Sequence, residues 1–180
     1  MSHLTKLYLS NHSFSGTHGV EGFAGSAIQN AIIDKSNITR EDPSLPTLVI
    51  VHVLNPFGMA NLRRWNENNV DLNRNFLTEK KFEEKKSMDP NAYGYKDLYD
   101  LINPSQLDWT DFFWAKVIYY ISLYGYSSLK QSLVTGNYYY PKSLFYGGNT
   151  LQPSHIKIRS FLTHQFELSQ VKELAVLDVQ

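Results

Sequence analysis

A histidine and a glutamate three residues apart form the first group that could do chemistry. His18 and Glu21 lie in the glycine-rich run SGTHGVEG, residues 15–22. Zinc binds imidazole nitrogen and carboxylate oxygen at about 2.0–2.2 Å, and a loop that enters a helix can present both donors to one point. A surface histidine beside a glutamate that favours a helix start explains the pair just as simply. The spacing alone therefore leaves half a zinc site and a structural turn as alternatives.

A polar, arginine-containing segment forms the second group. It contains the run NPFG at residues 55–58, then Arg63 and Arg64, then NENNVDLNRNF at residues 66–76. A guanidinium binds a carboxylate through two parallel charge-assisted hydrogen bonds, and asparagine adds a donor and an acceptor. Loops are commonly polar, so a solvated loop with structural Asp–Arg pairs is the alternative. The segment predicts a carboxylate site or a structural loop.

Strands and helices that alternate along the chain are predicted to position these groups. Residues 48–54 are apolar on both faces apart from His52, which is typical of a buried strand in a parallel sheet covered by helices. Residues 57–104 are expected to be largely loop, with residues 79–86 as a solvated charged stretch. The strands are expected at residues 4–9, 48–54 and 174–180, and the helices at residues 23–33, 108–124, 128–134 and 155–166. This alternation predicts an α/β fold.

The helix predicted to begin at Asp108 and end at Gly125 carries apolar residues at helical spacing. These residues are mostly aromatic: Trp109, Phe112, Phe113, Tyr120, Ile121 and Tyr124. Helical periodicity is typical of a face that packs in the core. We therefore expect this stripe to be core and not to bind a cofactor.

Length and composition restrict the class of protein. With 180 residues and 42% hydrophobic content, the chain suits a single domain over residues 1–180. Because 17 Lys and Arg balance 17 Asp and Glu, no broad field is available to hold nucleic acid or an anionic membrane. The absence of cysteine excludes thiol catalysis and thiolate zinc ligands. Without a signal-peptide pattern or a spanning apolar run, we expect a soluble, cytoplasmic protein.

Several motifs, in order along the chain, resemble the zinc carboxypeptidase superfamily, which includes the aspartoacylases and succinylglutamate desuccinylases. Residues 15–26, SGTHGVEGFAGS, carry the first motif, and residues 52–76 fit H-x-x-N-P-x-G followed by R-R-x-N-E-x-N-V-D-L-N-R-N-F. Residues 136–148 fit as well, and an uncharacterised bacterial carboxypeptidase-like branch is the nearest in pattern. The resemblance implies a three-layer α/β/α sandwich with a mixed, mostly parallel sheet.

The resemblance implies a zinc-dependent hydrolase that cleaves an amide bond near a free carboxylate. Its substrate would be a small peptide or an N-acyl amino acid, and the metal would activate a water molecule. The matched residues and their implied roles are zinc binding by His18 and Glu21, carbonyl polarisation by Arg63 or Arg64, and carboxylate binding by Asn73 and Arg74.

Two departures from the family pattern bear on activity. The third zinc ligand in the family is a histidine in a D-x-H-T-G motif, but residues 178–180 read DVQ. Gln180 therefore stands where histidine is expected, and a glutamine carbonyl is a poor zinc ligand beside imidazole. The family's general-base glutamate and its later strands are absent, so the sequence is expected to cover part of the domain and to be inert or nearly so by itself.

The sequence contains other histidines that could replace the third ligand. His52 resembles a family feature but fits better as a satisfied core histidine, and His12 is close in sequence. His155 and His164 are explained by the exposed face of their predicted helix. Gln180 and His52 remain the candidate third ligands.

A non-catalytic protein is the alternative to a hydrolase. Such a pseudoenzyme would bind a small carboxylate through Asn73 and Arg74, or would pair with another copy. Without later strands the sheet has an open edge, and open edges favour pairing into a homo-oligomer. Whether the chain is an enzyme stays open at this point.

Overall fold

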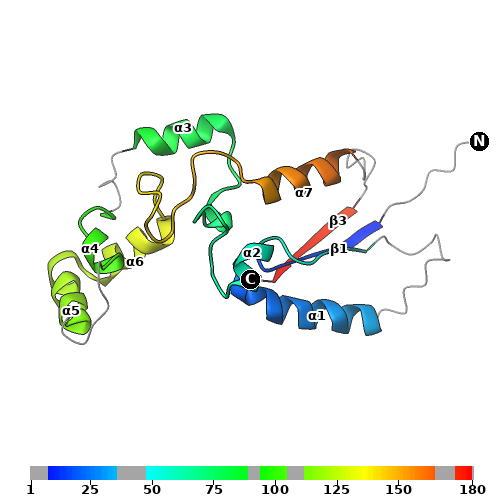
Figure 1. Cartoon of the computed structure of the whole chain (residues 1–180), viewed down its shortest axis with the longest axis horizontal. Helices are drawn as coiled ribbons and strands as arrows, with labels where there is room; N and C mark the ends of the chain where they lie inside the picture. Colours follow the sequence, from blue (N-terminus) through cyan, green and yellow to red (C-terminus); the bar gives the residue numbers. More distant parts are fainter. Residues whose placement is uncertain (1–7, 36–47, 89–93, 105–111, 165–172, 180) are drawn as a thin grey trace, which may run out of the picture. The chain divides into compact units, whose positions relative to one another are not determined.

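The computed structural model describes residues 8–35, 48–88, 94–104, 112–164 and 173–179 (Figure 1). The chain divides into two compact units. Unit 1 comprises the residues up to Asn68 and from Gln152 onward, and unit 2 comprises Asn69–Leu151. That both units belong to the single predicted domain stays a prediction.

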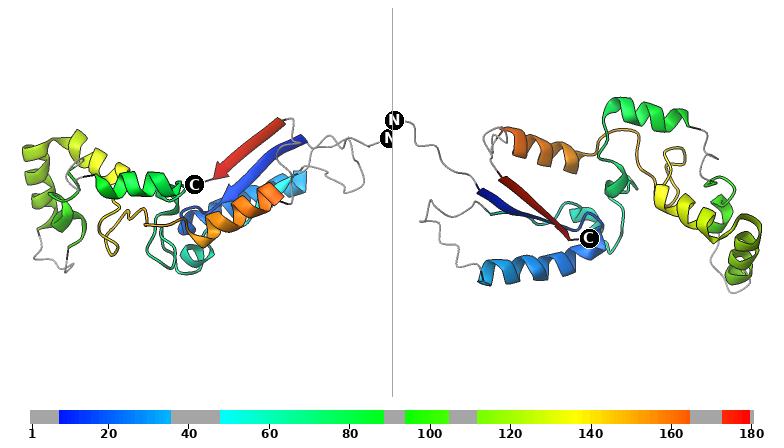
Figure 2. Two further views of the ribbon diagram at one scale, coloured as in Figure 1. Left: turned by 90° about the horizontal axis from the view of Figure 1, so that it is seen from above. Right: turned by 180° about the vertical axis from the view of Figure 1, so that it is seen from behind.

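Unit 1 is built on a parallel sheet. Its strands are β1 (Tyr8–Ser15), β2 (Val49–Val51) and β3 (Glu173–Val179), in the order β2-β1-β3. Figure 2 shows β1 and β3 side by side from two further directions. In the register, Phe14 of β1 is opposite both Val51 of β2 and Asp178 of β3. The predicted α/β class and parallel sheet are confirmed. β1 extends to Ser15, beyond the end of the strand predicted at residues 4–9, and β2 is shorter than the strand predicted at residues 48–54.

Two of the helices in unit 1 were predicted from the sequence. They are the 3-10 helix η1 (Gly19–Glu21), α1 (Gly22–Lys35), α2 (Pro56–Ala60) and α7 (Pro153–His164). The helices expected at residues 23–33 and 155–166 are confirmed as α1 and, over its described part, α7. Residues 4–7, 165, 166 and 180 of the predicted elements lie outside the described residues.

A buried polar contact joins α1 to the sheet. The Ser15 hydroxyl donates to Gln29 Oε1 at 3.3 Å, and Gln29 Nε2 donates to the Val51 carbonyl at 3.2 Å. Gly25 permits this contact, since a Cβ there would lie 2.3 Å from the Ser15 Cβ. The backbone of α1 therefore approaches the end of β1 closely, and Gln29 satisfies polar groups of two strands.

Unit 2 is made of short helices and long connections. Its helices are η2 (Leu72–Arg74), α3 (Glu79–Ser87), α4 (Tyr99–Ile102), α5 (Phe113–Tyr124) and α6 (Tyr126–Thr135). The core is centred on α4 and contains Tyr95, Leu98, Leu101 and Ile102. The helix predicted at residues 128–134 is confirmed as the longer α6.

The prediction that residues 57–104 are largely loop is only partly right. This segment contains α2, η2, α3 and α4, and three of them begin at a polar cap. Asn55 accepts from the Gly58 N–H, Asp71 from the Asn73 N–H and Thr78 from the Lys81 N–H. Helices of three to nine residues are too short to show a clear apolar period, so their capping residues looked like loop residues.

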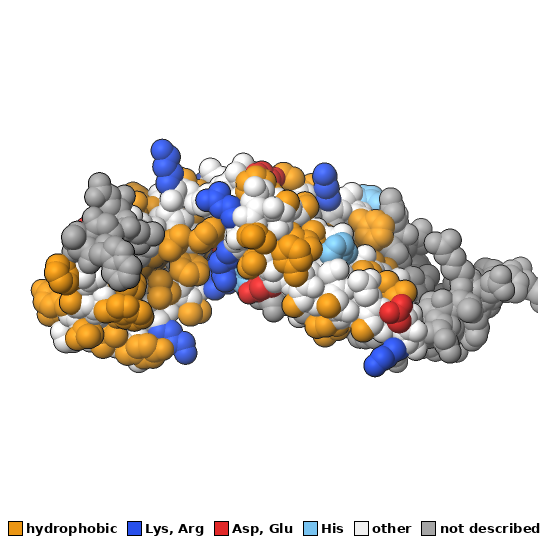
Figure 3. Space-filling model, turned by 60° about the horizontal axis from the view of Figure 1, so that its bottom comes forward, with side chains coloured by type: hydrophobic (Ala, Val, Ile, Leu, Met, Phe, Trp, Pro, Cys, Tyr) orange, Lys and Arg blue, Asp and Glu red, His pale blue; other side chains and the backbone are white. Residues whose placement is uncertain are grey.

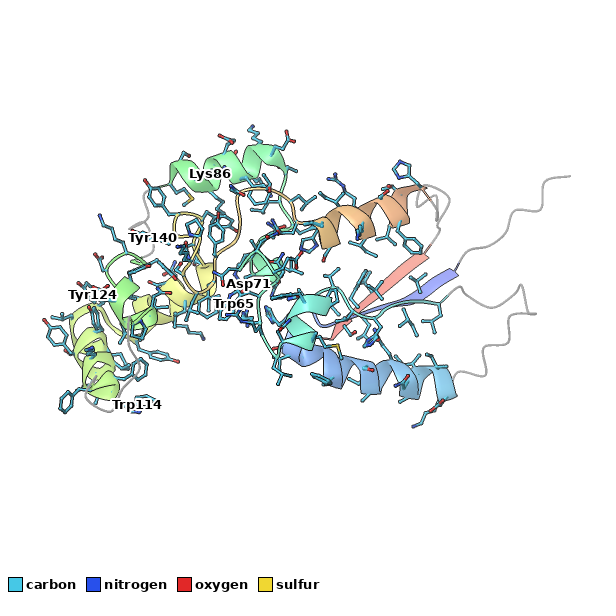
Figure 4. All side chains as sticks on the ribbon, in the orientation of Figure 1. Trp65, Asp71, Lys86, Trp114, Tyr124 and Tyr140 are labelled. Carbon is cyan, nitrogen blue, oxygen red and sulfur yellow. The ribbon has the colours of Figure 1, made fainter. Side chains whose placement is uncertain are left out.

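The prediction that the aromatic stripe is core is wrong. No residue of α5 is buried, and the stripe residues Phe112, Phe113 and Tyr124 are 74%, 41% and 45% exposed. Figure 3 shows hydrophobic side chains gathered over this end of unit 2, and Figure 4 shows Trp114 and Tyr124 on the outside of α5. Only Val117 and Tyr120 of α5 pack against the unit 2 core. The short α4 covers one strip of the helix, and periodicity alone cannot reveal that. Asp108 and Trp109 lie outside the described residues.

None of the described helices is long and apolar enough to cross a membrane. Aromatic side chains of α5 contact one another along the helix. The rings of Tyr120 and Tyr124 stack with centroids 6.0 Å apart, and those of Phe113 and Trp114 meet edge to face at 5.4 Å. Such pairs lower the cost of leaving large rings in water.

Three tyrosines predict how the stability of unit 2 depends on pH. Burial raises the pKa of Tyr95, Tyr138 and Tyr146 above the usual value of about 10. The unfolded chain therefore releases these protons first. Below about pH 10 these tyrosines leave the free energy of unfolding unchanged. Above that pH it falls, by up to about 1.4 kcal/mol per pH unit for each tyrosine.

Urea unfolding at pH 9 and pH 11 tests this expectation. The loss of unfolding free energy between the two values should be smaller in Tyr95→Phe than in the unchanged chain. Tyr139→Phe, at an exposed ring, is the matched control and should lose as much as the unchanged chain. Equal losses in all three proteins would contradict the assignment of the alkaline instability to buried phenols.

Candidate functional site

The structure brings the predicted zinc pair together. His18 precedes η1 and Glu21 ends it, and His18 Nδ1 lies 2.9 Å from Glu21 Oε2. The imidazole is buried, with 5% of the residue exposed, whereas the Glu21 side chain is 37% exposed. Because β1 ends at Ser15, the pair lies just beyond the carboxyl end of a parallel strand. Ligands bind at such places in open α/β sheets.

The loop that carries the two arginines runs beside the histidine loop. The Leu54 and Asn55 amides donate to the carbonyls of Ser15 and Gly16, both at 3.1 Å. Asn55 is 1% exposed and its side-chain Nδ2 donates to the Arg64 carbonyl at 3.1 Å. Its Oδ1 accepts from Gly58 at 2.9 Å and so caps α2. One buried asparagine therefore fixes both ends of the segment that leads to Arg64.

Close packing of two glycines holds the loops together. A Cβ on Gly19 would lie 2.1 Å from the carbonyl carbon of Gly58, so a side chain at position 19 would force the backbones apart. This contact joins η1 to α2, which pack against each other. Arg63 is exposed and Arg64 is half-buried. The zinc pair and the predicted carbonyl-polarising arginines thus lie on adjacent loops of unit 1.

The predicted carboxylate-binding residues, Asn73 and Arg74, belong to η2 in unit 2. Asn73 is exposed and Arg74 is half-buried. Arg74 Nε donates to the Val134 carbonyl at 2.9 Å, and its Nη1 donates to the Asn73 carbonyl at 3.1 Å. The guanidinium is therefore positioned by carbonyl groups, which use two of its five N–H donors.

Buried polar side chains set the conformation around η2. Asp71 is buried, and its Oδ1 accepts from the Asn73 amide at 3.0 Å. Asn75, also buried, donates to the carbonyls of Gly147 and Thr150 at 3.0 and 2.8 Å. The Tyr138 hydroxyl donates to the Arg74 carbonyl at 2.7 Å. In this run the buried side chains of Asp71 and Asn75 are structural, whereas Asn73 lies on the surface.

The structure supplies no third ligand within its described part. The expectation that His52 is a core histidine is wrong: β2 ends at Val51, and His52 is exposed with Nδ1 3.4 Å from Ser15 Oγ. Gln180 and the side chain of His12 lie outside the described residues. Across the described ranges, no group of three or more His, Cys, Asp and Glu side chains could hold a metal ion.

Two positions were missed or misjudged from the sequence. Asp178 lies near the end of β3, and the Thr17 hydroxyl donates to its Oδ1 at 3.5 Å, so a carboxylate lies next to the histidine loop. Its place in the D-x-H-like run was the available signal. The expected exposure of His164 is confirmed, but His155 is buried, because it packs in the first turn of α7.

A family model for proteins of unknown function, DUF2817, matches residues 10–180. The chain therefore belongs to this family. Neither a curated protein nor a solved structure matches the chain.

Replacing Asn55 by alanine should destabilise unit 1. The change removes the cap of α2 and leaves the buried Gly58 N–H and Arg64 carbonyl without this partner, at a cost of about 2–3 kcal/mol. The matched control is Asn61→Ala, because Asn61 is exposed and donates to the Phe57 carbonyl from the solvent side. Urea unfolding should show less than about 0.5 kcal/mol for the control. A similar loss in both variants would contradict the role given to Asn55.

Proposed function

We propose that unit 1 carries a zinc half-site of the carboxypeptidase or deacylase kind. The observation that supports it is the 2.9 Å approach of His18 Nδ1 to Glu21 Oε2 at the end of β1. Donors bound tetrahedrally to zinc at about 2.0–2.1 Å lie about 3.3–3.4 Å apart. The observed pair is closer because it forms a hydrogen bond, which zinc would have to replace, and the partly exposed Glu21 side chain can turn to admit the metal. The donor types therefore fit zinc, and a small turn of Glu21 gives the required spacing.

The proposed reaction is hydrolysis of an amide bond near a free carboxylate in a small peptide or an N-acyl amino acid. Bound zinc would supply an activated water and a Lewis acid for the carbonyl. The protein's own groups would have these roles: His18 and Glu21 hold the metal, Arg63 or Arg64 donates to the scissile carbonyl oxygen, and Asn73 and Arg74 bind the carboxylate. Support for the last role is that Arg74 is held in place by carbonyl groups and is not paired with a carboxylate among the described residues.

A half-site limits what this chain can do by itself. Catalytic zinc sites normally have three protein ligands and a water molecule. Since the described part of the chain offers two donors at one point, we expect weak zinc binding. Turnover further requires a third donor and a general base. The proposal includes the three-layer α/β/α arrangement, which the parallel sheet supports, and the cytoplasmic location expected from the sequence.

Calorimetric titration of zinc into the metal-stripped chain tests this proposal. We expect weak one-to-one binding that His18→Ala and Glu21→Gln each reduce by about tenfold or more, because each removes one of two donors. His164→Ala, at an exposed histidine of α7, is the control and should bind zinc like the unchanged chain. Binding that survives His18→Ala would mean that the pair does not hold the metal.

A second candidate is a non-catalytic module that pairs with a second copy. The observation that favours it is β3, which pairs with β1 alone among the described strands. Val176 and Leu177 are 58% and 41% exposed, although consecutive side chains of a strand point to opposite faces. An edge strand that is apolar and exposed on both faces is a template for pairing.

Light scattering distinguishes this second candidate. Pairing along β3 predicts a dimer that Val176→Lys converts to monomer, because a charged side chain at an edge opposes pairing. Ile33→Lys, at an exposed position of α1, is the matched control and should leave the dimer intact. A monodisperse monomer of the unchanged chain would exclude pairing through this edge.

A further inference from the structure

Unit 2 contains a cavity of about 700 Å³ that the proposed zinc site does not use. Small-molecule sites typically measure about 300–1,000 Å³ and are mostly apolar. Three helices supply most of the apolar lining here: Leu101 and Ile102 of α4, Phe113 and Val117 of α5, and Leu129 and Leu133 of α6. Leu101 and Ile102 are buried, whereas Phe113 is 41% exposed. The cavity therefore has an apolar floor and reaches the surface beside α5.

The wall formed by Asn103 and Leu144 is fixed by hydrogen bonds. Asn103 Nδ2 donates to the Tyr99 carbonyl at 3.1 Å, and Asn103 Oδ1 accepts from the Leu144 amide at 2.8 Å. The Tyr95 hydroxyl donates to the Leu144 carbonyl at 2.5 Å. Behind this wall, Asn137 Nδ2 donates to the Ser143 hydroxyl at 2.9 Å. A cavity with a wall held in this way is formed before a ligand arrives, which lowers the ordering cost of binding.

One charged side chain lies at this cavity. Lys142 belongs to the lining and is exposed, and no acidic residue lines the described wall. Within the described part of the chain, no carboxylate lies within ion-pair distance of Lys142. The amide of Asn103 is already used to hold the wall. The ammonium group of Lys142 is thus the lining group suited to an anion, and the rest of the lining favours an apolar body.

We propose that this cavity binds an amphipathic monocarboxylate, whose apolar chain or ring enters between α4, α5 and α6 and whose carboxylate contacts Lys142. Burial of the apolar part supplies the driving force, at about 25 cal/mol per Å² removed from water. The single cation selects a single negative charge over a neutral or cationic head group. This inference is independent of the proposed zinc site, because none of the cavity residues belongs to that site.

Calorimetry on the full, metal-stripped chain tests the proposal with decanoate, decanol and decyltrimethylammonium below their micelle concentrations. We expect saturable one-to-one binding of decanoate, weaker binding of decanol and the weakest binding of the cation. Lys142→Gln should weaken decanoate about tenfold, the worth of a charge-assisted hydrogen bond, and leave decanol unchanged. Lys130→Gln, at an exposed lysine of α6 outside the lining, is the matched control and should change neither ligand.

A variant that fills the cavity provides the second arm. Val117→Trp should abolish binding of decanoate and decanol, and circular dichroism with urea unfolding reports whether it folds. Methyl NMR of the unchanged chain gives an answer that does not depend on that variant, because decanoate should shift the methyl signals of Leu101 and Leu133. The absence of saturable decanoate binding, equal affinity for decanoate and decanol, or an undiminished affinity in Lys142→Gln would each overturn the proposal.

Discussion

The contact between Gly19 and Gly58 is the constraint on which the candidate site of unit 1 depends. It lets the backbone of η1 lie directly against α2, with no side chain between them. Loops beyond the carboxyl ends of parallel strands start close together, but their separation depends on the side chains between them. Glycine at both positions removes that spacer, and Asn55 then locks the second loop by bonding its two ends. This backbone packing positions His18 and Glu21.

Buried asparagine and aspartate side chains take the place of regular secondary structure around both predicted groups. Asn55, Asp71 and Asn75 are almost completely buried, and each satisfies backbone groups that an irregular loop would otherwise leave unpaired. The structural alternative for the Asn-rich run is therefore partly right, and the carboxylate site stays a prediction. Its buried members are structural, whereas its basic residues Arg63 and Arg74 remain exposed or half-buried. Buried and exposed residues alternate along one motif because the buried side chains hold the loop that presents the arginines.

Sequence patterns predicted the elements that have a continuous apolar or small-residue run or a recognisable motif. The apolar runs predicted β2 and β3, the small-residue run predicted α1, and the glycine-flanked H-x-x-E spacing predicted the contact between His18 and Glu21. What they missed depends on tertiary packing. Short helices carry too few residues to show a period, and no pattern shows that a four-residue helix covers only part of α5. The end of β2 at Val51, which exposes His52, likewise depends on pairing with β1 and not on local composition.

The packing of secondary structure within each unit explains why the two units hold different kinds of candidate site. In unit 1, parallel strands end at one edge, and the loops beyond that edge carry polar donors such as those of His18 and Glu21. In unit 2, the helices are short and α4 has only four residues, so its apolar side chains do not fill the space between α5 and α6. Because the cavity reaches the surface, the leucine, isoleucine and valine side chains that line it face water, which is unfavourable. An apolar ligand removes that cost in unit 2. The polar donors on the loops of unit 1 gain nothing from an apolar ligand.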